Sequence, residues 1–217
     1  MIEHVYRRAS AARLIDAVLV ATDDARIKNA VEEFGGVACM TSPTHASGTD
    51  RLAEVVADLH CGLVVGVQGD EPLLDPAVID AAIAPLRADA SIAMGTVARA
   101  LHGADELTNP NVVKVVRDRA GFALYFSRAP IPHGRDRSAA AEVRVHIGLY
   151  VYRRDTLLRL AGLERGPLER AEMLEQLRAL EHGIRIKVAD TSYQSFGVDT
   201  LEDLDRVRQL MLAGVHE

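Results

Sequence analysis

The stretch LVVGVQGDEPLLDPAVIDAAIAPL (residues 63–86) places a short apolar run, a polar turn and a helical pattern in direct succession. Residues 63–67 are apolar or glycine throughout, which is typical of a strand buried on both faces of a sheet. Asp75 followed by Pro76 indicates a helix start, because the aspartate can cap the helix and proline suits its first position. We therefore predict a strand over 63–67 and a helix over 76–86.

The same alternation continues on both sides of this stretch. Further apolar runs predict strands over residues 17–21, 92–97, 112–116, 124–126, 147–152 and 184–188, the last near a sheet edge because it alternates apolar and polar residues. Amphipathic patterns predict helices over residues 1–12, 25–34, 50–59, 167–182 and 200–212. In residues 167–182, Met173, Leu177 and Leu180 would form the buried stripe. This order predicts an α/β fold with a mostly parallel sheet, and residues 1–217 fit a single domain.

The composition excludes several classes of protein. Hydrophobic residues make up 48% of the 217 residues, enough to build a core, and the net charge of −6 offers no global basic surface for nucleic acid. No apolar run approaches the ~20 residues of a membrane helix, and the first residues do not follow a signal-peptide pattern. Two cysteines, Cys39 and Cys61, do not make a disulfide framework. We expect a cytoplasmic globular protein without nucleic-acid or membrane partners.

Two glycine–aspartate turns carry residues suited to metal chemistry. The turn 68–72 (QGDEP) follows the first predicted strand, at the end where α/β sheets bind ligands, and it offers Asp70 and Glu71. The turn 197–200 (GVDT) offers Asp199 before the last predicted helix. Two carboxylates together with substrate phosphate oxygens can hold one Mg²⁺. Either turn taken alone is also explained as an ordinary helix cap.

Two polar loops have both an ordinary and a functional interpretation. The loop 41–51 (TSPTHASGTDR) can contact a base or a ribose through its hydroxyls and amides, or can serve only to cap the following helix. Residues 128–143 (RAPIPHGRDRSAAAEV) predict a long mobile loop that could order as a lid. Arg128, Arg135 and Arg137 in this loop can bind carboxylate or phosphate groups, or remain solvated.

Three further residues are open to two interpretations. His146 begins a predicted strand, where it could face a ligand or lie in the core. Glu175 and Arg178 lie three residues apart on a predicted helix and could form only a surface ion pair.

Eight motifs then occur in a characteristic order: VATDD (20–24), TSPTHASGTDRLAEV (41–55), VQGDEPLL (67–74), NPNVVKVV (109–116), ALYFSRAPIP (123–132), HIGLYVYR (146–153), PLERAEMLEQLR (167–178) and GVDTLEDLDRVR (197–208). Over nearly the whole chain, this set resembles the 3-deoxy-manno-octulosonate cytidylyltransferase family. The resemblance implies a Rossmann-like nucleotidyltransferase fold with a small dimerisation extension. It also implies a reaction in which CMP from CTP is joined to the sugar acid KDO with release of pyrophosphate, which activates KDO for lipopolysaccharide biosynthesis.

The resemblance further implies a Mg²⁺-dependent cytoplasmic homodimer and a role for each matching residue. Asp70 and Asp199 would be the catalytic metal ligands, and Gln68 would contact the sugar acid near the reacting centre. The sugar acid would lie against Arg128, Arg135, His146, Tyr150, Glu175 and Arg178, and the cytidine near Ser42, His45, Ser47, Gly48 and Arg51. Residues 128–182 would contain the mobile arm and the dimerisation and sugar-binding elements.

The sequence departs from the family pattern at its beginning. The family opens with a strand and a loop of the form ARxxSxRLPGKPL, whose arginine and lysine hold the triphosphate, whereas residues 1–5 here match the helix after that loop. We therefore expect a missing segment of about 30 residues, the size of the first strand and loop of a βαβ unit, and two open sheet edges. The missing segment leaves one alternative, an inactive nucleotide-binding or dimerising remnant. The motif set leaves a second alternative, a cytidylyltransferase for a related sugar acid.

Overall fold

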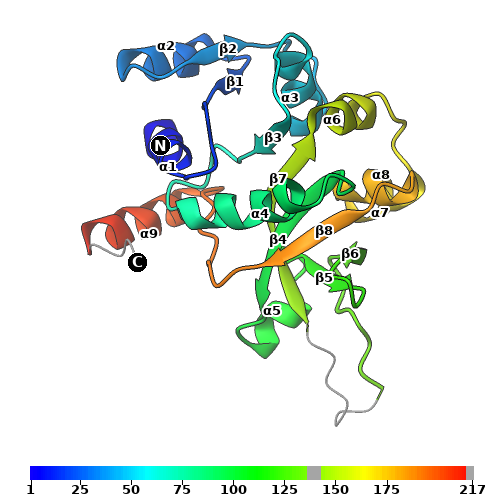
Figure 1. The fold of residues 1–217 in the computed structure, drawn as a ribbon. Coiled ribbons are helices and arrows are strands. Elements are labelled where there is room, and N and C mark those ends of the chain that lie inside the picture. Colours follow the sequence, from blue (N-terminus) through cyan, green and yellow to red (C-terminus); the bar gives the residue numbers. More distant parts are fainter. Residues whose placement is uncertain (136–142, 214–217) are drawn as a thin grey trace.

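The computed structural model describes residues 1–135 and 143–213, and a mixed sheet forms its centre (Figure 1). The strands β6 (Ala123–Ser127), β5 (Lys114–Arg117), β7 (Arg144–Arg153), β4 (Met94–Ala100) and β8 (Ile186–Asp190) are neighbours in this order, and β3 (Leu63–Gly66) also pairs with β7. β8 lies at the end of the order and alternates buried and partly exposed residues, which confirms the expected edge position.

The α/β alternation is confirmed, and the direction of the strands shows how the sheet is mixed. β3, β4 and β5 all pair antiparallel with β7, while β8 pairs parallel with β4, so β3, β4, β5 and β8 share one direction. β6 pairs antiparallel with β5 and therefore runs with β7. Most strands are thus parallel in direction, yet most neighbouring pairs are antiparallel, because β7 lies between strands that run the other way.

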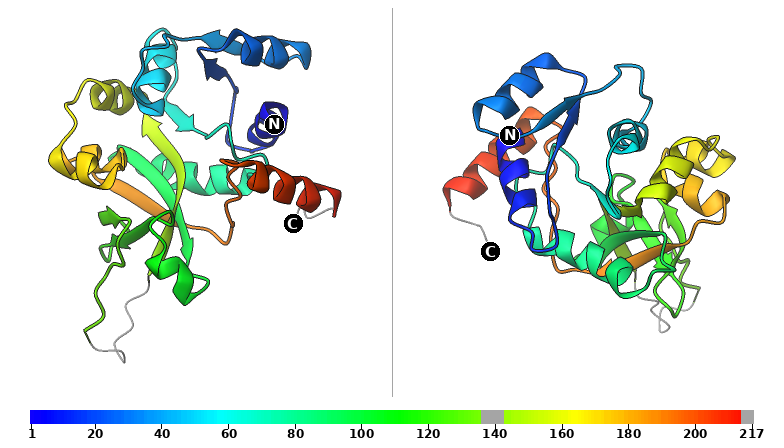
Figure 2. Two further views of the ribbon diagram at one scale, coloured as in Figure 1. Left: turned by 180° about the vertical axis from the view of Figure 1, so that it is seen from behind. Right: turned by 45° about the horizontal axis from the view of Figure 1, so that its top comes forward.

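A second, two-stranded parallel sheet is formed by β1 (Val20–Thr22) and β2 (Ala38–Met40), apart from the main sheet (Figure 2). Within the described residues, β1 pairs only with β2 and β3 pairs only with β7. In the described part of the chain, β1 and β3 therefore each have one unpaired edge. Residues of both strands line the same large cavity.

The predicted helices begin within two residues of their expected positions, and polar side chains cap several of them; the helix expected from residue 50 begins at Gly48. Asp24 accepts a hydrogen bond from Arg26 N at 2.8 Å, Ser47 accepts one from Asp50 N at 3.2 Å, and Asp75 accepts one from Ala77 N at 2.8 Å. The helices are α1 (Ile2–Ser10), α2 (Ala25–Glu33), α3 (Gly48–Ala57), α4 (Pro76–Ala88), α5 (Ala104–Thr108), α6 (Arg154–Ala161), α7 (Pro167–Glu172), α8 (Gln176–Glu181) and α9 (Leu201–Leu212). Sequence analysis missed α5, α6 and β2. No helix among the described residues is long and apolar enough to cross a membrane.

The helix predicted over 167–182 is wrong as one element. α7 ends at Glu172 and α8 begins at Gln176, because Met173 adopts a left-handed conformation with φ of 53°. Its side chain is 74% exposed and does not join the apolar stripe, whereas Leu174 and Leu177 are buried. A left-handed residue other than glycine costs conformational energy, and such strain is often found at functional sites.

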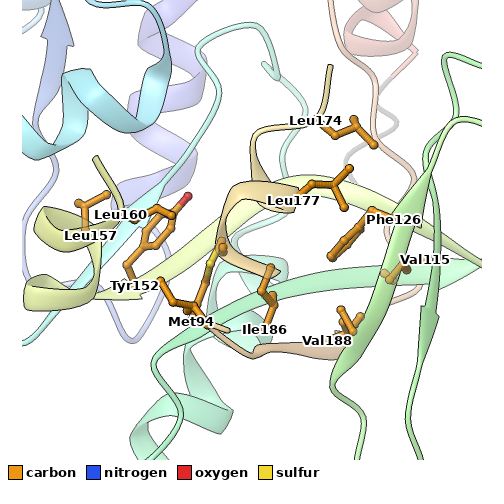
Figure 3. Packing of buried hydrophobic residues seen from close by; sticks show 14 of the residues in the cluster. Met94, Val115, Phe126, Tyr152, Leu157, Leu160, Leu174, Leu177, Ile186 and Val188 are labelled. Carbon is orange, nitrogen blue, oxygen red and sulfur yellow. The ribbon is translucent and has the colours of Figure 1, made fainter. Parts of the chain in front are cut away.

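The main sheet separates two hydrophobic clusters. Met94 and Tyr152 belong to one cluster, whereas Val97 and Val151 on the same strands belong to the other. This follows from the alternation of side chains along a strand. Figure 3 shows the first cluster, where α6 and α8 pack on the sheet; α4 supplies helical residues to the second. Both faces of the sheet are therefore covered by helices, as a predominantly apolar set of strands requires.

Candidate functional site

One large cavity, of about 1500 Å³, contains residues from several of the predicted site motifs. We call it the central cavity. The predicted site residues that line it are Gly48, Arg51, Gln68, His146, Tyr150 and Glu175. These residues come from α3, from the turn after β3, from β7 and from the break between α7 and α8. The fold therefore brings together part of the predicted nucleotide loop, Gln68 and half of the six predicted sugar-facing side chains.

The two glycine–aspartate turns meet in the structure. Val198 N donates a hydrogen bond to Asp70 O at 2.9 Å, which places Asp199 next to the turn that holds Asp70. The Oδ1 atom of Asp70 is buried and has no hydrogen-bond partner among the described residues. A buried carboxylate oxygen without a donor is unfavourable unless a cation or another ligand satisfies it. The hydrogen bond between the two turns supports the prediction that both aspartates serve one site.

Glu71 has a different role from Asp70. Its carboxylate accepts hydrogen bonds from Tyr193 Oη at 3.1 Å and from Ser195 Oγ at 2.6 Å. Burial raises the pKa of the Glu71 carboxyl, and the charge of Asp70 raises it further against these two hydrogen bonds. Glu71 thus fixes the segment 193–195, while Asp70 remains the carboxylate with an available oxygen.

The ordinary explanation of Asp199 as a helix cap does not hold. Thr200 is the residue that caps α9, through its side chain, and Asp203 completes the capping box. Asp203 Oδ2 accepts hydrogen bonds from Thr200 N at 2.9 Å and from Asp199 N at 3.3 Å. The Asp199 residue is exposed, so its carboxylate is open to a ligand.

The predicted nucleotide loop is held by α3 through two charged residues. Glu54 accepts a hydrogen bond from Ser42 N at 3.0 Å and contacts the His45 imidazole, which lowers the pKa of Glu54. Arg51 donates to Thr41 Oγ1 and forms an ion pair with Asp23 at 3.2 Å. The loop is therefore ordered by protein contacts without a ligand. Sequence analysis did not identify Glu54, although it lies on the helix that directly follows the loop.

A row of rings lines the opposite wall. His146 contacts Phe126 edge-on with ring centroids 5.0 Å apart, and Tyr150 lies 5.3 Å from His146. His146 Nε2 lies 3.0 Å from Thr96 Oγ1. The ring borders the cavity but lies deep in the fold, and burial lowers the pKa of its imidazole to about 3. His146 is therefore a neutral hydrogen-bonding group at neutral pH.

Glu175 joins the two sides of the cavity. Thr49 Oγ1, in the first turn of α3, donates to Glu175 Oε2 at 2.8 Å, just before α8. The predicted ion pair between Glu175 and Arg178 is replaced by this contact. The link fixes the predicted nucleotide loop relative to the predicted sugar-facing residues.

The expectation that Arg178 faces a sugar acid is wrong, because its side chain is only 3% exposed. Its guanidinium binds the Glu169 carboxylate through two hydrogen bonds, of 2.8 and 2.7 Å, and lies 3.8 Å from Asp50. The hydrogen bonds that Arg178 donates to Glu169 raise the pKa of the guanidinium, so the pair stays charged. Arg178 thus connects α7, α8 and α3 rather than the cavity.

Arg128 also binds protein groups rather than facing the cavity. Its guanidinium donates to Glu172 O at 2.8 Å, Pro110 O at 3.0 Å and Met173 O at 3.4 Å. This corrects the expectation of a free substrate clamp, because each of its three nitrogens already donates to a carbonyl group. Arg135 is exposed and does not line the central cavity. Arg137 and residues 136–142 of the predicted arm lie outside the described residues.

Sequence analysis missed a buried lysine that shapes the same wall. Lys114 is 0% exposed, and its Nζ donates to Asn109 O at 2.9 Å and to Val112 O and Arg128 O, each at 2.6 Å. Burial lowers its pKa. These contacts fix the loop 109–113, of which Asn111, Val112 and Val113 line the cavity. The available signal was a lysine inside an otherwise apolar run, VVKVV.

The remaining predicted residues occupy positions around the cavity. Ser42 and Ser47 belong to the ordered loop, Gln68 is exposed at the cavity wall, and His45 contacts Glu54. Within the described residues, no group of three or more His, Cys, Asp or Glu side chains is arranged to hold a metal by itself. A metal here would need ligands from a substrate in addition to Asp70 and Asp199, which is the usual mode for Mg²⁺ at phosphates.

Comparison with known proteins gives consistent results. The cytidylyltransferase family model matches residues 1–186. The chain is 52% identical over 215 residues to the 3-deoxy-manno-octulosonate cytidylyltransferase of Solibacter usitatus, covering 99% of this chain and 85% of that protein. It is 58% identical to the enzyme of the same name from Syntrophotalea carbinolica, with 95% and 86% covered.

Solved structures agree with these relatives. A CMP:2-keto-3-deoxy-manno-octonic acid synthetase in complex with CTP superimposes with a TM-score of 0.93 at 41% identity, covering 98% of this chain and 88% of that one. A 4-diphosphocytidyl-2C-methyl-D-erythritol synthase from Anaerococcus prevotii gives a TM-score of 0.64 at 14% identity, with 97% and 88% covered, which shows a shared fold only.

The buried pair of Arg178 and Glu169 predicts strong energetic coupling. Arg178→Met removes both hydrogen bonds that the buried Glu169 carboxylate accepts from the guanidinium and leaves it the ion pair with Arg165 at 3.5 Å, so it is expected to lower the free energy of unfolding by about 3 kcal/mol. The double variant Arg178→Met with Glu169→Leu should lose less than the sum of the two single variants. Urea denaturation measures the free energy of unfolding of the single and double variants. Arg208→Met, which removes one partner of the exposed pair with Asp205, is the control and should lower this free energy by about 1 kcal/mol or less. Additive losses in the double variant contradict the coupling.

The neutral His146 predicts a pH-dependent contribution to stability. Below its ordinary pKa of 6.5 the unfolded imidazole binds a proton, whereas the folded one does not until about pH 3. The contribution of His146 to the free energy of unfolding is therefore fully present above pH 6.5. It is lost as the pH falls toward 3, by up to about 1.4 kcal/mol per pH unit. The free energy of unfolding of wild type minus that of His146→Gln should fall by about 2 kcal/mol between pH 6 and pH 4. A difference that stays constant with pH overturns this assignment.

Proposed function

Because this chain belongs to the 3-deoxy-manno-octulosonate cytidylyltransferase family, we propose that it transfers CMP from CTP to the sugar acid KDO and releases pyrophosphate. The observation that carries this proposal is the 52% identity over 99% of the chain with a curated enzyme of that activity. The product is an activated sugar acid, so the reaction serves lipopolysaccharide biosynthesis.

We place the cytidine at the α3 side of the central cavity, near the loop that contains Ser42, His45, Ser47, Gly48 and Arg51. This side offers backbone amides and hydroxyls that Glu54 holds in place before a ligand arrives. Such preorganisation favours binding, because the ordering of the loop does not have to be supplied by the nucleotide.

We assign Mg²⁺ binding to Asp70 and Asp199. The residues fit this ion, because Asp70 Oδ1 is a buried oxygen without a partner among the described residues and the Val198–Asp70 hydrogen bond joins the two turns. When bound, Mg²⁺ neutralises charge on phosphate oxygens and lowers the pKa of a nearby attacking hydroxyl. Phosphate oxygens of CTP would complete the coordination, as expected where the protein supplies only two carboxylates.

We place KDO at the end of the cavity formed by residues 111–113, 146–150 and 173–176, which we call the sugar end. The anomeric hydroxyl of KDO attacks the α-phosphorus in line, a new P–O bond forms, and the bond to the leaving pyrophosphate breaks. Gln68 follows β3 and lines the cavity, in the same turn as Asp70. His146 contributes a neutral hydrogen-bonding ring, and Glu175 accepts from hydroxyl groups.

The protein would act as a cytoplasmic homodimer. The exposed apolar side chains of Leu124, Leu168 and Met173 on and beside the α7–α8 region support an interface there. Sedimentation of the purified chain tests this state, with the monomer mass as the result against it.

Pyrophosphate release by this chain with CTP, KDO and Mg²⁺ tests the function. Asp70→Asn should reduce the rate at least about 100-fold, because loss of one key electrostatic group in catalysis has effects of this size. The same variant should keep or raise the melting temperature, since asparagine replaces a buried unpartnered carboxylate. Asp205→Asn, at an exposed aspartate that pairs with Arg208, is the matched control and should retain the full rate.

The outcomes separate the candidate functions. Wild-type rates in Asp70→Asn contradict the metal assignment. A folded wild type that binds CTP but releases no pyrophosphate supports the non-catalytic alternative instead. Faster turnover with another sugar acid than with KDO supports the related cytidylyltransferase.

A further inference from the structure

Glu71 links the turn after β3 to the segment that leads to Asp199. Its two carboxylate oxygens accept separate hydrogen bonds, Oε2 from Tyr193 Oη at 3.1 Å and Oε1 from Ser195 Oγ at 2.6 Å. The two donors lie 122 and 124 positions further along the chain. A single side chain therefore joins two parts of the candidate site that are distant in the sequence.

The two ends of this link differ in how firmly the core holds them. Close to Glu71, Leu74 is only 1% exposed and anchors the turn. The segment 191–199 has no regular secondary structure, and Tyr193 packs against the second hydrophobic cluster near its start. α9 follows at the periphery of the molecule (Figure 1), and its buried residue, Val207, belongs to neither cluster. Core packing therefore fixes the turn and the start of the segment, but not the residues that lead into α9.

Polar contacts with the turn hold those later residues. Ser195 Oγ binds Glu71, and three residues later Val198 N donates to Asp70 O at 2.9 Å. Consecutive Cα atoms are only about 3.8 Å apart, so a chain that is held at Ser195 and Val198 keeps Asp199 close to the turn. One connection through the Glu71 side chain and one through the backbone thus set the separation of the two aspartates.

We propose that Glu71 is a positioning residue that sets the separation of Asp70 and Asp199, and thereby the affinity of the site for a divalent cation. This inference rests on the proposed function, because it takes these two aspartates as the ligands of Mg²⁺. Mg²⁺ requires near-ideal octahedral geometry with short bonds to oxygen, of about 2.0–2.1 Å, so a displaced carboxylate binds it less well. Glu71 acts through Asp199, since both of its oxygens already accept from protein hydroxyls.

Two variants remove the link in different ways. Glu71→Met removes both acceptor oxygens and one charge, whereas the double variant Tyr193→Phe with Ser195→Ala removes the two donors and keeps the charge. Amide hydrogen exchange, followed by NMR without metal or nucleotide, should accelerate at Val198 in both variants. The acceleration should be at least about tenfold greater than at amides of β4 and β7, because the segment opens locally while the main sheet stays closed.

Metal affinity is measured with Mn²⁺, which takes the same oxygen ligands as Mg²⁺ and gives an EPR signal when free. With CTP present, and with the Mn²⁺ held by CTP alone subtracted, both variants should bind the ion at least about fivefold more weakly than wild type, as expected for the loss of hydrogen bonds. A merely structural defect lowers the number of intact sites but not the affinity of those that remain. Glu33→Met, which removes an exposed carboxylate at the end of α2, is the control and should change neither measurement.

The remaining outcomes contradict the proposal in distinct ways. Wild-type exchange at Val198 in both variants, or equal acceleration in β4 and β7, overturns the link. Wild-type Mn²⁺ affinity in both variants overturns the effect on the cation site. Weaker Mn²⁺ binding in Glu71→Met alone overturns the positioning role, because the charge of Glu71 would then act on the ion directly. A wild type that binds no Mn²⁺ beyond that held by CTP overturns instead the metal assignment on which the proposal rests.

Discussion

The pairing of β7 with three other strands is the constraint on which the rest of the structure depends. β7 pairs with β4 over most of its length, with β3 along residues 150–153 and with β5 at residues 144–145. Since side chains alternate along a strand, this one element divides the molecule into two hydrophobic clusters and sets His146 and Tyr150 on the cavity wall. The position of the candidate sugar end follows from the register of β7 against β4.

Three cations near the sugar end serve the architecture around the site: Lys114 and Arg178 are buried, and Arg128 is partly buried. Lys114, Arg128 and Arg178 all lie near the sugar end, yet each is occupied by carbonyl or carboxylate oxygens of the chain. Buried charges are stable only when they are paired and hydrogen-bonded, and these three meet that condition by fixing loops and helix ends. Asp70 Oδ1 and Gln176 Nε2 are among the buried atoms that have no hydrogen-bond partner in the described part of the chain. They identify where ligands are needed.

Sequence reasoning located most elements of the site but could not assign the partners of long side chains. The turns at Asp70 and Asp199 were identified correctly as neighbours, because both follow apolar segments of one α/β sheet. Arg178 was placed at the sugar acid by the family resemblance, whereas its guanidinium binds Glu169, which lies on a separate helix beyond a left-handed residue. Nothing in the periodicity of 167–182 distinguishes a continuous helix from two short ones.

The sequence by itself determined the α/β class, the helix start capped by Asp75 and the family, because these depend on local patterns and on the order of motifs. Tertiary structure alone decided that β7 runs against its neighbours, that Lys114 is buried among carbonyls, and that the Gln176 amide lacks a partner. The physical reason is that strand direction and hydrogen-bond satisfaction depend on residues distant in the chain. Local propensity carries no information about which of them come into contact.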